Sequence, residues 1–202
     1  MTLRVRQSSD RLAEEYDARW QRYIDASVRL AVEAISLTGR ERVLDLACGT
    51  GQLERQLLAR WPDLQITGVD VSPNMLGRAL ATRLRVHWLA GEAASLPLAD
   101  AQFDAVACLS AFHYFRQPRA ALAEMRRVLR PGGRLIVVDW CDDYLTCKLC
   151  SAWLRLTDPA FYQTYSLAGC RAEVRQAGFQ VVSATRHRIG WLWGMMRVVC
   201  RG

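Results

Sequence analysis

The sequence predicts an α/β fold, in which a mostly parallel sheet carries helices on both faces and ends in an antiparallel hairpin. Two observations lead to this prediction. Short apolar runs of the buried-strand type alternate with segments whose apolar residues recur at helical spacing, which is the pattern of a parallel sheet. The last two strand-like segments are separated by too few residues for a crossover helix, so they must pair antiparallel.

The elements follow one another without a change of composition or an internal repeat. Seven strands are expected, at residues 42–47, 65–70, 85–90, 103–110, 134–140, 180–189 and 191–200. Helices are expected at residues 8–37, 51–61, 72–80, 117–129 and 166–179. Ser72 is a suitable N-cap with Pro73 at the first helical position, and Pro62 and Gly39 mark helix ends.

The composition indicates one globular domain. The chain has 202 residues, of which 51% are hydrophobic and 23% charged, so it can bury one core. We expect a single domain over 1–202, with a helical cap at 1–40, a sheet core at 41–140 and a C-terminal segment at 141–202. No apolar run approaches the roughly 20 residues of a spanning helix, and the charged N-terminus lacks the apolar core of a secretory signal. These features predict a cytoplasmic location.

The formal net charge is +7, and Lys148 is the only lysine. Arginines are locally concentrated in residues 126–134, which could indicate a nucleic-acid site. The same pattern is typical of a solvated helix face and its C-terminal turn, where cations interact favourably with the helix dipole. We expect no nucleic-acid partner, and we leave peripheral contact with an anionic surface open.

Seven cysteines, an odd number at irregular spacing, favour a reducing compartment over a disulfide framework. Cys141, Cys147 and Cys150 form a cluster that could bind a metal or a soft metalloid. No second pair and no nearby histidine completes a zinc site, so the prediction is that no metal is bound.

The stretch LDLACGTGQL at residues 44–53 places two glycines directly after the first strand. Gly49 and Gly51 would let a ligand approach the backbone, at the N-terminus of the next helix. Asp70, which ends the second strand, is placed to accept hydrogen bonds from two ribose hydroxyls. Glu54 occupies the position of the third glycine in the dinucleotide pattern. The ligand expected here is a nucleoside without phosphates, and the alternative is a tight turn with no ligand.

Four motifs in order carry a resemblance to a known family: VLDLACGTGQL, GVDVSPNML, AGEAASLPLADAQFDAVAC and VLRPGGRLIVVDW. They resemble the successive motifs of class I S-adenosylmethionine-dependent methyltransferases, most closely the ubiquinone/menaquinone-biosynthesis-like group that acts on small molecules. The resemblance covers about residues 40–140. It implies a Rossmann-like seven-stranded fold, S-adenosylmethionine as cofactor, and methyl transfer to oxygen or carbon of a small apolar or aromatic acceptor.

Other functions remain open beside this one. They are a related cofactor chemistry such as aminopropyl transfer, cofactor binding without methyl transfer, and metalloid methylation through the three clustered cysteines. The resemblance fades after residue 140, where the acceptor would be selected, so the acceptor's identity is not implied.

The resemblance also implies roles for individual residues. Those expected near the methionine part of the cofactor are Asp45, Ala47, Cys48, Gly49, Gly51 and Ser110. Those expected near the ribose and adenine are Asp70, Val71, Met75, Glu92 and Ala93, and Tyr16 would cap the site. Ala47 stands where the family often has glycine, which predicts a negative φ at that position.

Two further residues are catalytic candidates. His113, in the segment SAFHYF after the fourth strand, would lie beside the transferred methyl group and could accept a proton from a hydroxyl or an acidic carbon. The alternative is a histidine that packs or orders its loop. Asp139 ends the fifth strand at the same rim and could orient a substrate or a metal. The aromatic residues that follow could line a substrate pocket or form the packed underside of a helical insertion: Trp140, Tyr144, Trp153, Phe161, Tyr162 and Tyr165.

Overall fold

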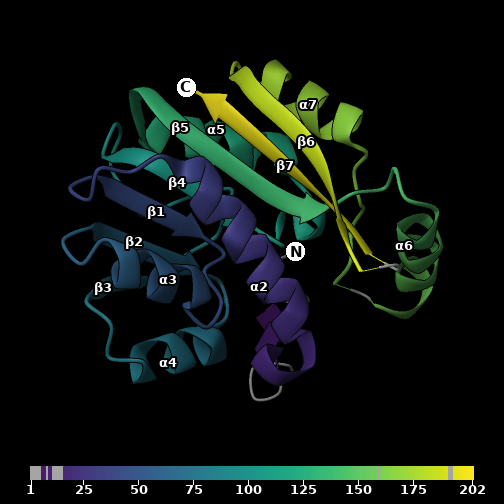
Figure 1. Ribbon diagram of the computed structural model, residues 1–202, viewed down its shortest axis with the longest axis horizontal. Coiled ribbons are helices and arrows are strands. Elements are labelled where there is room, and N and C mark those ends of the chain that lie inside the picture. The colour runs from purple at the N-terminus through teal and green to yellow at the C-terminus, as the bar shows by residue number, and fades with distance from the viewer. Residues whose placement is uncertain (1–5, 8, 11–15, 159, 191–192) are drawn as a thin grey trace.

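The computed structural model describes residues 6–7, 9–10, 16–158, 160–190 and 193–202. Its strands form one sheet in the order β3-β2-β1-β4-β5-β7-β6 (Figure 1). The strands are β1 Arg42–Leu46, β2 Gln65–Asp70, β3 Val86–Ala90, β4 Phe103–Leu109, β5 Leu129–Trp140, β6 Gln180–Ile189 and β7 Trp193–Arg201. The first five are parallel, and β7 runs antiparallel to both β5 and β6. The predicted fold class is confirmed.

The helices are α2 Tyr16–Ile35, α3 Gln52–Arg60, α4 Pro73–Ala81, α5 Pro118–Val128, α6 Leu145–Thr157 and α7 Leu167–Gln176, with a 3-10 turn η1 at Phe112–Tyr114. Ser72 caps α4 as expected, because its side chain accepts the backbone N–H of Met75. The α6 helix was anticipated only as part of a helical insertion.

Each face of the sheet has its own core. On β1, Val43 belongs to a cluster with side chains of α2 and α3, while Leu44 belongs to a second cluster with side chains of α5 and α7. This separation follows from the alternation of side chains along a strand. Figure 1 shows α2 crossing the sheet diagonally on the face that also carries α3.

Two strands begin more than one residue away from their expected starts. The β5 strand begins at Leu129 rather than at residue 134, because Leu129 pairs with Phe103 before an irregularity in the register. The β7 strand begins at Trp193, and the two preceding residues of the expected strand lie outside the described residues.

The strand order reverses between β1 and β4, whose following segments run to opposite sides of the sheet. In open α/β sheets a ligand binds beyond the carboxyl ends of the strands at such a point. Among the described residues, no helix is long and apolar enough to cross a membrane.

Candidate functional site

The turn after β1 contains two glycines that serve different purposes. Gly51 has φ +85°, and a Cβ atom placed on it would lie 2.9 Å from Cη2 of Trp88. Gly49 has φ +56°, but an added Cβ atom would meet nothing within 4 Å. Gly51 is therefore required by packing within the protein, whereas Gly49 presents bare backbone to open space.

The prediction of a negative φ at Ala47 is wrong. Its φ is +63°, in the left-handed region that glycine usually occupies. The carbonyl oxygen of Val69 accepts the backbone N–H groups of both Ala47, at 2.7 Å, and Cys48, at 3.1 Å. These two hydrogen bonds hold the chain in a conformation that alanine would otherwise avoid.

Asp70 connects this turn to the start of α4. One carboxylate oxygen accepts the backbone N–H of Gly49 at 2.9 Å, and the other accepts the backbone N–H of Ser72 at 2.8 Å. Burial raises the pKa of Asp70, and the hydrogen bonds from Ser72 and Gly49 oppose that shift. Each oxygen retains acceptor capacity, so the carboxylate could also bind hydroxyl groups of a ligand.

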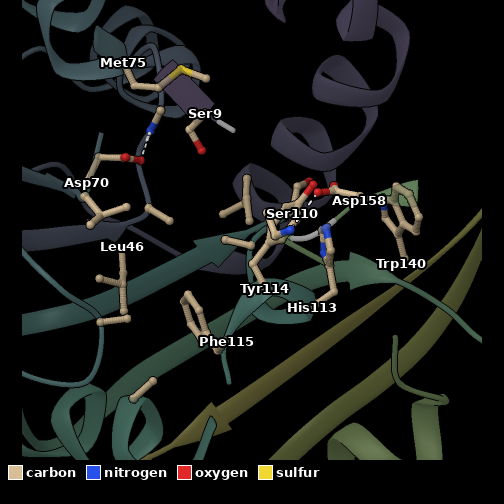
Figure 2. Close-up of a pocket in the computed structure, with 18 of the residues that line it drawn as sticks. Ser9, Leu46, Asp70, Met75, Ser110, His113, Tyr114, Phe115, Trp140 and Asp158 are labelled. Atoms are coloured by element: carbon tan, nitrogen blue, oxygen red, sulfur yellow. Dashed lines mark hydrogen bonds between the residues drawn. The ribbon is translucent and has the colours of Figure 1, made fainter. Parts of the chain in front are cut away.

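A cavity of about 410 Å³ lies over the carboxyl ends of the strands. At one end it is bounded by the turn after β1, by Asp70 and Met75, and by Glu92 and Ala93 beyond β3. His113 and Trp140 bound the other end. Figure 2 shows the two ends, with Asp70 and Met75 on one side and His113, Trp140 and Asp158 on the other.

Most of the predicted site residues line this cavity. They are Ala47, Gly49, Asp70, Val71, Met75, Glu92, Ala93, Ser110 and His113. Four others do not line it: Asp45, Cys48, Gly51 and Asp139. Tyr16 begins α2, but its side chain lies outside the described residues.

Asp45 is directed away from the cavity, toward Glu54 of α3. Both carboxyl groups are buried, and both oxygens of Glu54 lack a hydrogen-bond partner within the described chain. Burial, and next the charge of Asp70, raise the pKa of Asp45 to about 7. Burial and the nearby Asp45 raise the pKa of Glu54 well above its usual value. Burial therefore favours the protonated form of Glu54, and this side chain does not line the cavity.

His113 and Asp139 form a buried pair. Nδ1 of His113 lies 2.7 Å from Oδ1 of Asp139, and the backbone N–H of His113 donates to Oδ2 at 3.0 Å. The imidazole stacks on Trp140 with the ring centroids 5.0 Å apart. With Nδ1–H donating to the carboxylate, Nε2 is the nitrogen left to accept a proton. The two catalytic candidates are thus in contact, but only His113 reaches the cavity.

Aromatic side chains from three parts of the chain surround the His113 end. Trp140 and Trp153, from the predicted aromatic stretch, line the cavity there. Trp20, Tyr23 and Trp193 also line it, and the sequence interpretation missed them. The other aromatic residues of the stretch do not line the cavity: Tyr144, Phe161, Tyr162 and Tyr165. Phe161 nevertheless lies beside His113, with the ring centroids 6.1 Å apart. Trp20 and Tyr23 have helical spacing typical of core residues, so the sequence contained no signal that set them apart.

In the described part of the chain, the three clustered cysteines belong to no group of three or more potential ligands that could hold a metal ion. Cys147 instead accepts the backbone N–H of Gly194, at 3.3 Å. Burial raises the pKa of Cys141 to about 11, and also raises the pKa of Cys147 and of Cys150. Raised values disfavour the thiolate that binds metals.

Comparison with known proteins agrees with the geometry. Residues 43–133 match the family model of a methyltransferase domain. Residues 43–133 form an S-adenosylmethionine-dependent methyltransferase domain, and S-adenosylmethionine is its cofactor.

Among curated proteins, the chain is 41% identical over 128 residues to a demethylmenaquinone methyltransferase of Thermus thermophilus, covering 61% of this chain and 55% of that protein. It is 31% identical over 155 residues to the O-methyltransferase cnsE of Penicillium expansum, covering 72% of this chain and 54% of that protein. The chain thus spans little more than half the length of these relatives.

Solved structures show the same fold at lower identity. One belongs to the complex between the Haloferax volcanii Trm112 methyltransferase activator and a methyltransferase, with a TM-score of 0.86 and 21% identity, covering 96% of both chains. Another is the [4+2]-cyclase SpnF, with a TM-score of 0.72 and 23% identity, covering 88% of this chain and 80% of that one. Because a cyclase shares the fold, the fold by itself does not identify the reaction.

Proposed function

We propose that this chain transfers a methyl group from S-adenosylmethionine to an oxygen or carbon atom of a small, largely apolar acceptor, with His113 as general base. The observation that carries the proposal is the continuity of the cavity. The same cavity is lined by Gly49 and Asp70 at one end and by His113 at the other. A cofactor and an acceptor bound in it would meet between these two ends.

The residues at the first end fit the cofactor. The open space over Gly49 suits close approach of the methionine part, and the Asp70 carboxylate suits the ribose hydroxyls. Ser110 has a buried Oγ atom with no partner within the described chain, which a polar group of the ligand would satisfy. Val71 and Met75 offer apolar contact to the adenine, while Glu92 offers an acceptor for its amino group.

The positions of three predicted residues alter their proposed roles. Asp45 and Cys48 do not line the cavity, so we propose that they shape the turn after β1 and do not contact the cofactor directly. Asp139 touches neither ligand in this proposal and is a positioning residue for His113.

The proposed reaction requires the protein to align the acceptor with the methyl group and to accept one proton. S-adenosylmethionine supplies an electrophilic methyl group, whose departure leaves a neutral thioether. The aromatic wall would orient the acceptor and exclude water. Nε2 of His113 would take the proton from the acceptor's hydroxyl or acidic carbon as that atom bonds to the methyl carbon. Asp139 would stabilise the imidazolium that results.

The experiment that tests the function uses cofactor labelled in its methyl group. Purified protein is incubated with the labelled cofactor and a panel of phenols, quinols and amines, and the organic extracts are analysed. The proposal predicts a labelled product together with an equal amount of S-adenosylhomocysteine. Cofactor binding without either product would instead establish a binding module, and label retained in the cofactor with another product would establish a different cofactor chemistry.

The wider setting of the protein is also a proposal. The +7 net charge supports peripheral contact with an anionic surface, and no nucleic-acid partner is proposed. The single sheet of the described residues supports one domain over 1–202. A cytoplasmic location remains a prediction, which fractionation of the source cells would test.

A further inference from the structure

The outward side of α6 is unusually apolar. Leu145, Leu149, Trp153 and Leu156 are 72%, 64%, 61% and 88% exposed. Their spacing of four, four and three residues places them along one side of the helix, and we call these four residues the α6 stripe. Exposed apolar residues scattered singly are normal in proteins, but a continuous row of this kind marks an interaction surface.

The inward side of α6 is the more polar of the two. Cys147 contacts the backbone of Gly194 in β7, and Ser151 shares a hydrogen bond of 2.8 Å with Thr164. A surface helix of a globular protein normally turns its apolar side inward. The reversal in α6 indicates that the stripe meets an apolar partner outside the described chain.

The two charged side chains within α6 are positive, whereas acids flank the helix at both ends, with Asp142 and Asp143 before it and Asp158 at its C-cap. Lys148 and Arg155 are exposed, and at about 100° per residue both fall on the same edge of the stripe. Neither makes an ion pair with any described residue. Asp143, the exposed acid just before α6, lies 3.8 Å from the guanidinium of Arg186, which offsets its charge. Leucine and tryptophan flanked by Lys and Arg are typical of helices that lie in the interface of an anionic bilayer.

A second copy of the chain fits this surface poorly. The α6 helix has 13 residues. Such a helix is about 20 Å long and about 10 Å wide, so pairing two of them would bury about 400 Å² in total. A stable protein interface buries roughly 1,200 Å² or more. Pairing would also bring Lys148 and Arg155 of the two copies close together.

The same helix forms a wall of the cavity. Cys150, Leu154 and Thr157 line the cavity from α6, and Trp153 belongs to both the lining and the stripe. Figure 1 shows α6 at the edge of the molecule, beside the end of β6 and the start of β7. Any external surface in contact with the stripe would therefore lie next to the acceptor end of the cavity.

We propose that the α6 stripe docks on the surface of an anionic lipid membrane and places the cavity where an apolar acceptor can enter from the lipid. The proposed docking is inferred from the α6 stripe and from the cations at its edge. The entry of the acceptor rests on the proposed function.

The test measures binding to vesicles in the absence of cofactor and acceptor. The wild type is sedimented with vesicles of phosphatidylglycerol mixed with phosphatidylcholine, and with vesicles of phosphatidylcholine alone. The double variant Leu149→Glu, Leu156→Glu changes the stripe without altering a cavity-lining residue. The matched control is Leu80→Glu, Val182→Glu, whose wild-type side chains are 59% and 58% exposed on other elements. Circular dichroism establishes that each variant is folded.

The proposal predicts that the wild type binds the anionic vesicles and that the stripe variant binds them about 100-fold more weakly. The control should bind as the wild type does. The variant Lys148→Ala, Arg155→Ala should bind the anionic vesicles about 10-fold more weakly than the wild type. High salt should weaken wild-type binding by a similar factor.

Failure of the wild type to bind anionic vesicles would overturn the proposal, as would an equal loss in the control. It would also be overturned by a wild-type dimer that Leu149→Glu, Leu156→Glu converts to monomer, since the stripe would then hold a second copy. Turnover of a water-soluble acceptor should be unchanged in the stripe variant. This last measurement separates failure of docking from failure of the proposed methyl transfer.

Discussion

Two hydrogen bonds join His113 to Asp139, one from the ring at 2.7 Å and one from the backbone N–H at 3.0 Å. The residues lie on η1 and at the end of β5, and the carboxylate is 1% exposed. The ring and the backbone are held by the same group, so both the tautomer and the orientation of the imidazole are determined before any ligand arrives. This arrangement gives separate expectations for the two side chains.

Replacing His113 with alanine should abolish proton acceptance without disturbing the cofactor end of the cavity. We expect kcat to fall by about 10²–10⁴ for an oxygen or carbon acceptor, with little change in cofactor Kd. Steady-state kinetics and calorimetric titration measure the two quantities. His87→Ala is the control, because His87 is exposed on β3 and should give wild-type kinetics. A loss of only a few-fold would mean that alignment alone carries the reaction and that the acceptor needs no protein base.

Asp139→Asn tests whether the carboxylate acts through His113. An amide placed at Oδ1 can donate to Nδ1, which would leave the proton on Nε2 and remove the acceptor from the cavity. We expect kcat to fall by at least about 10-fold while the KM for cofactor stays constant. The double variant with His113→Ala should be no slower than His113→Ala alone. Additive losses would show that Asp139 contributes independently of the histidine.

Asp70→Ala should weaken S-adenosylmethionine binding by about 1–3 kcal/mol, since hydrogen bonds to a charged acceptor are lost. Part of the effect would come from the freed N–H groups of Gly49 and Ser72, which the carboxylate holds in the free protein. Calorimetric titration measures it. Asp63→Ala, at an exposed position in the turn before β2, should bind cofactor normally. An unchanged affinity in a folded Asp70→Ala protein would remove this residue from the site.

The parts of the site that the sequence predicted are those that depend on neighbours in the chain. A strand, a glycine turn and an acid at the next strand end are local patterns, and parallel pairing brings Gly49 and Asp70 to the same edge of the sheet. The left-handed conformation of Ala47 was not predictable in this way. It depends on hydrogen bonds to Val69, a residue of the adjacent strand.

The sequence did not predict the contacts between segments that are far apart in the chain. His113 and Asp139 are 26 residues apart and were each proposed for the rim, but their direct contact depends on how η1 packs against β5. Trp20 and Trp193 reach the cavity from α2 and β7, at opposite ends of the chain. The exposure of the α6 stripe was equally hidden, because an amphipathic sequence does not reveal which side of a helix faces the core.

Two glycine substitutions should change stability in opposite directions. Gly51→Ala would place a Cβ atom 2.9 Å from Trp88 at a positive φ, so we expect a loss of about 1–3 kcal/mol in the free energy of unfolding. Gly77 lies within α4, and an added Cβ atom there meets nothing within 4 Å. Gly77→Ala should therefore gain about 0.5–1 kcal/mol. Urea denaturation measures both, and equal effects would contradict the packing around Gly51.

The buried pair of Asp45 and Glu54 should make stability fall as the pH rises. The pKa of Glu54 is raised well above its ordinary value of 4.5, so the folded protein holds a proton that the unfolded chain releases. Its contribution to stability is complete below the unfolded pKa and is lost as pH rises through the folded pKa. One such group gives a slope of up to about 1.4 kcal/mol per pH unit. Asp45, whose pKa is about 7, adds a contribution of the same sign.

Glu54→Gln keeps the shape of the neutral acid and removes its titration. Urea denaturation of the cofactor-free protein between about pH 5 and about pH 8 should give a smaller slope than the wild type has. Identical slopes for wild type and Glu54→Gln would mean that Glu54 is already ionised in the folded protein.

Glu41 provides the opposite case. Burial alone would raise its pKa, but hydrogen bonds from Thr38 and Gly39 outweigh burial and lower it to about 2. Its stabilising contribution is present above the unfolded pKa and is lost in acid, so Glu41→Gln should destabilise the protein at neutral pH.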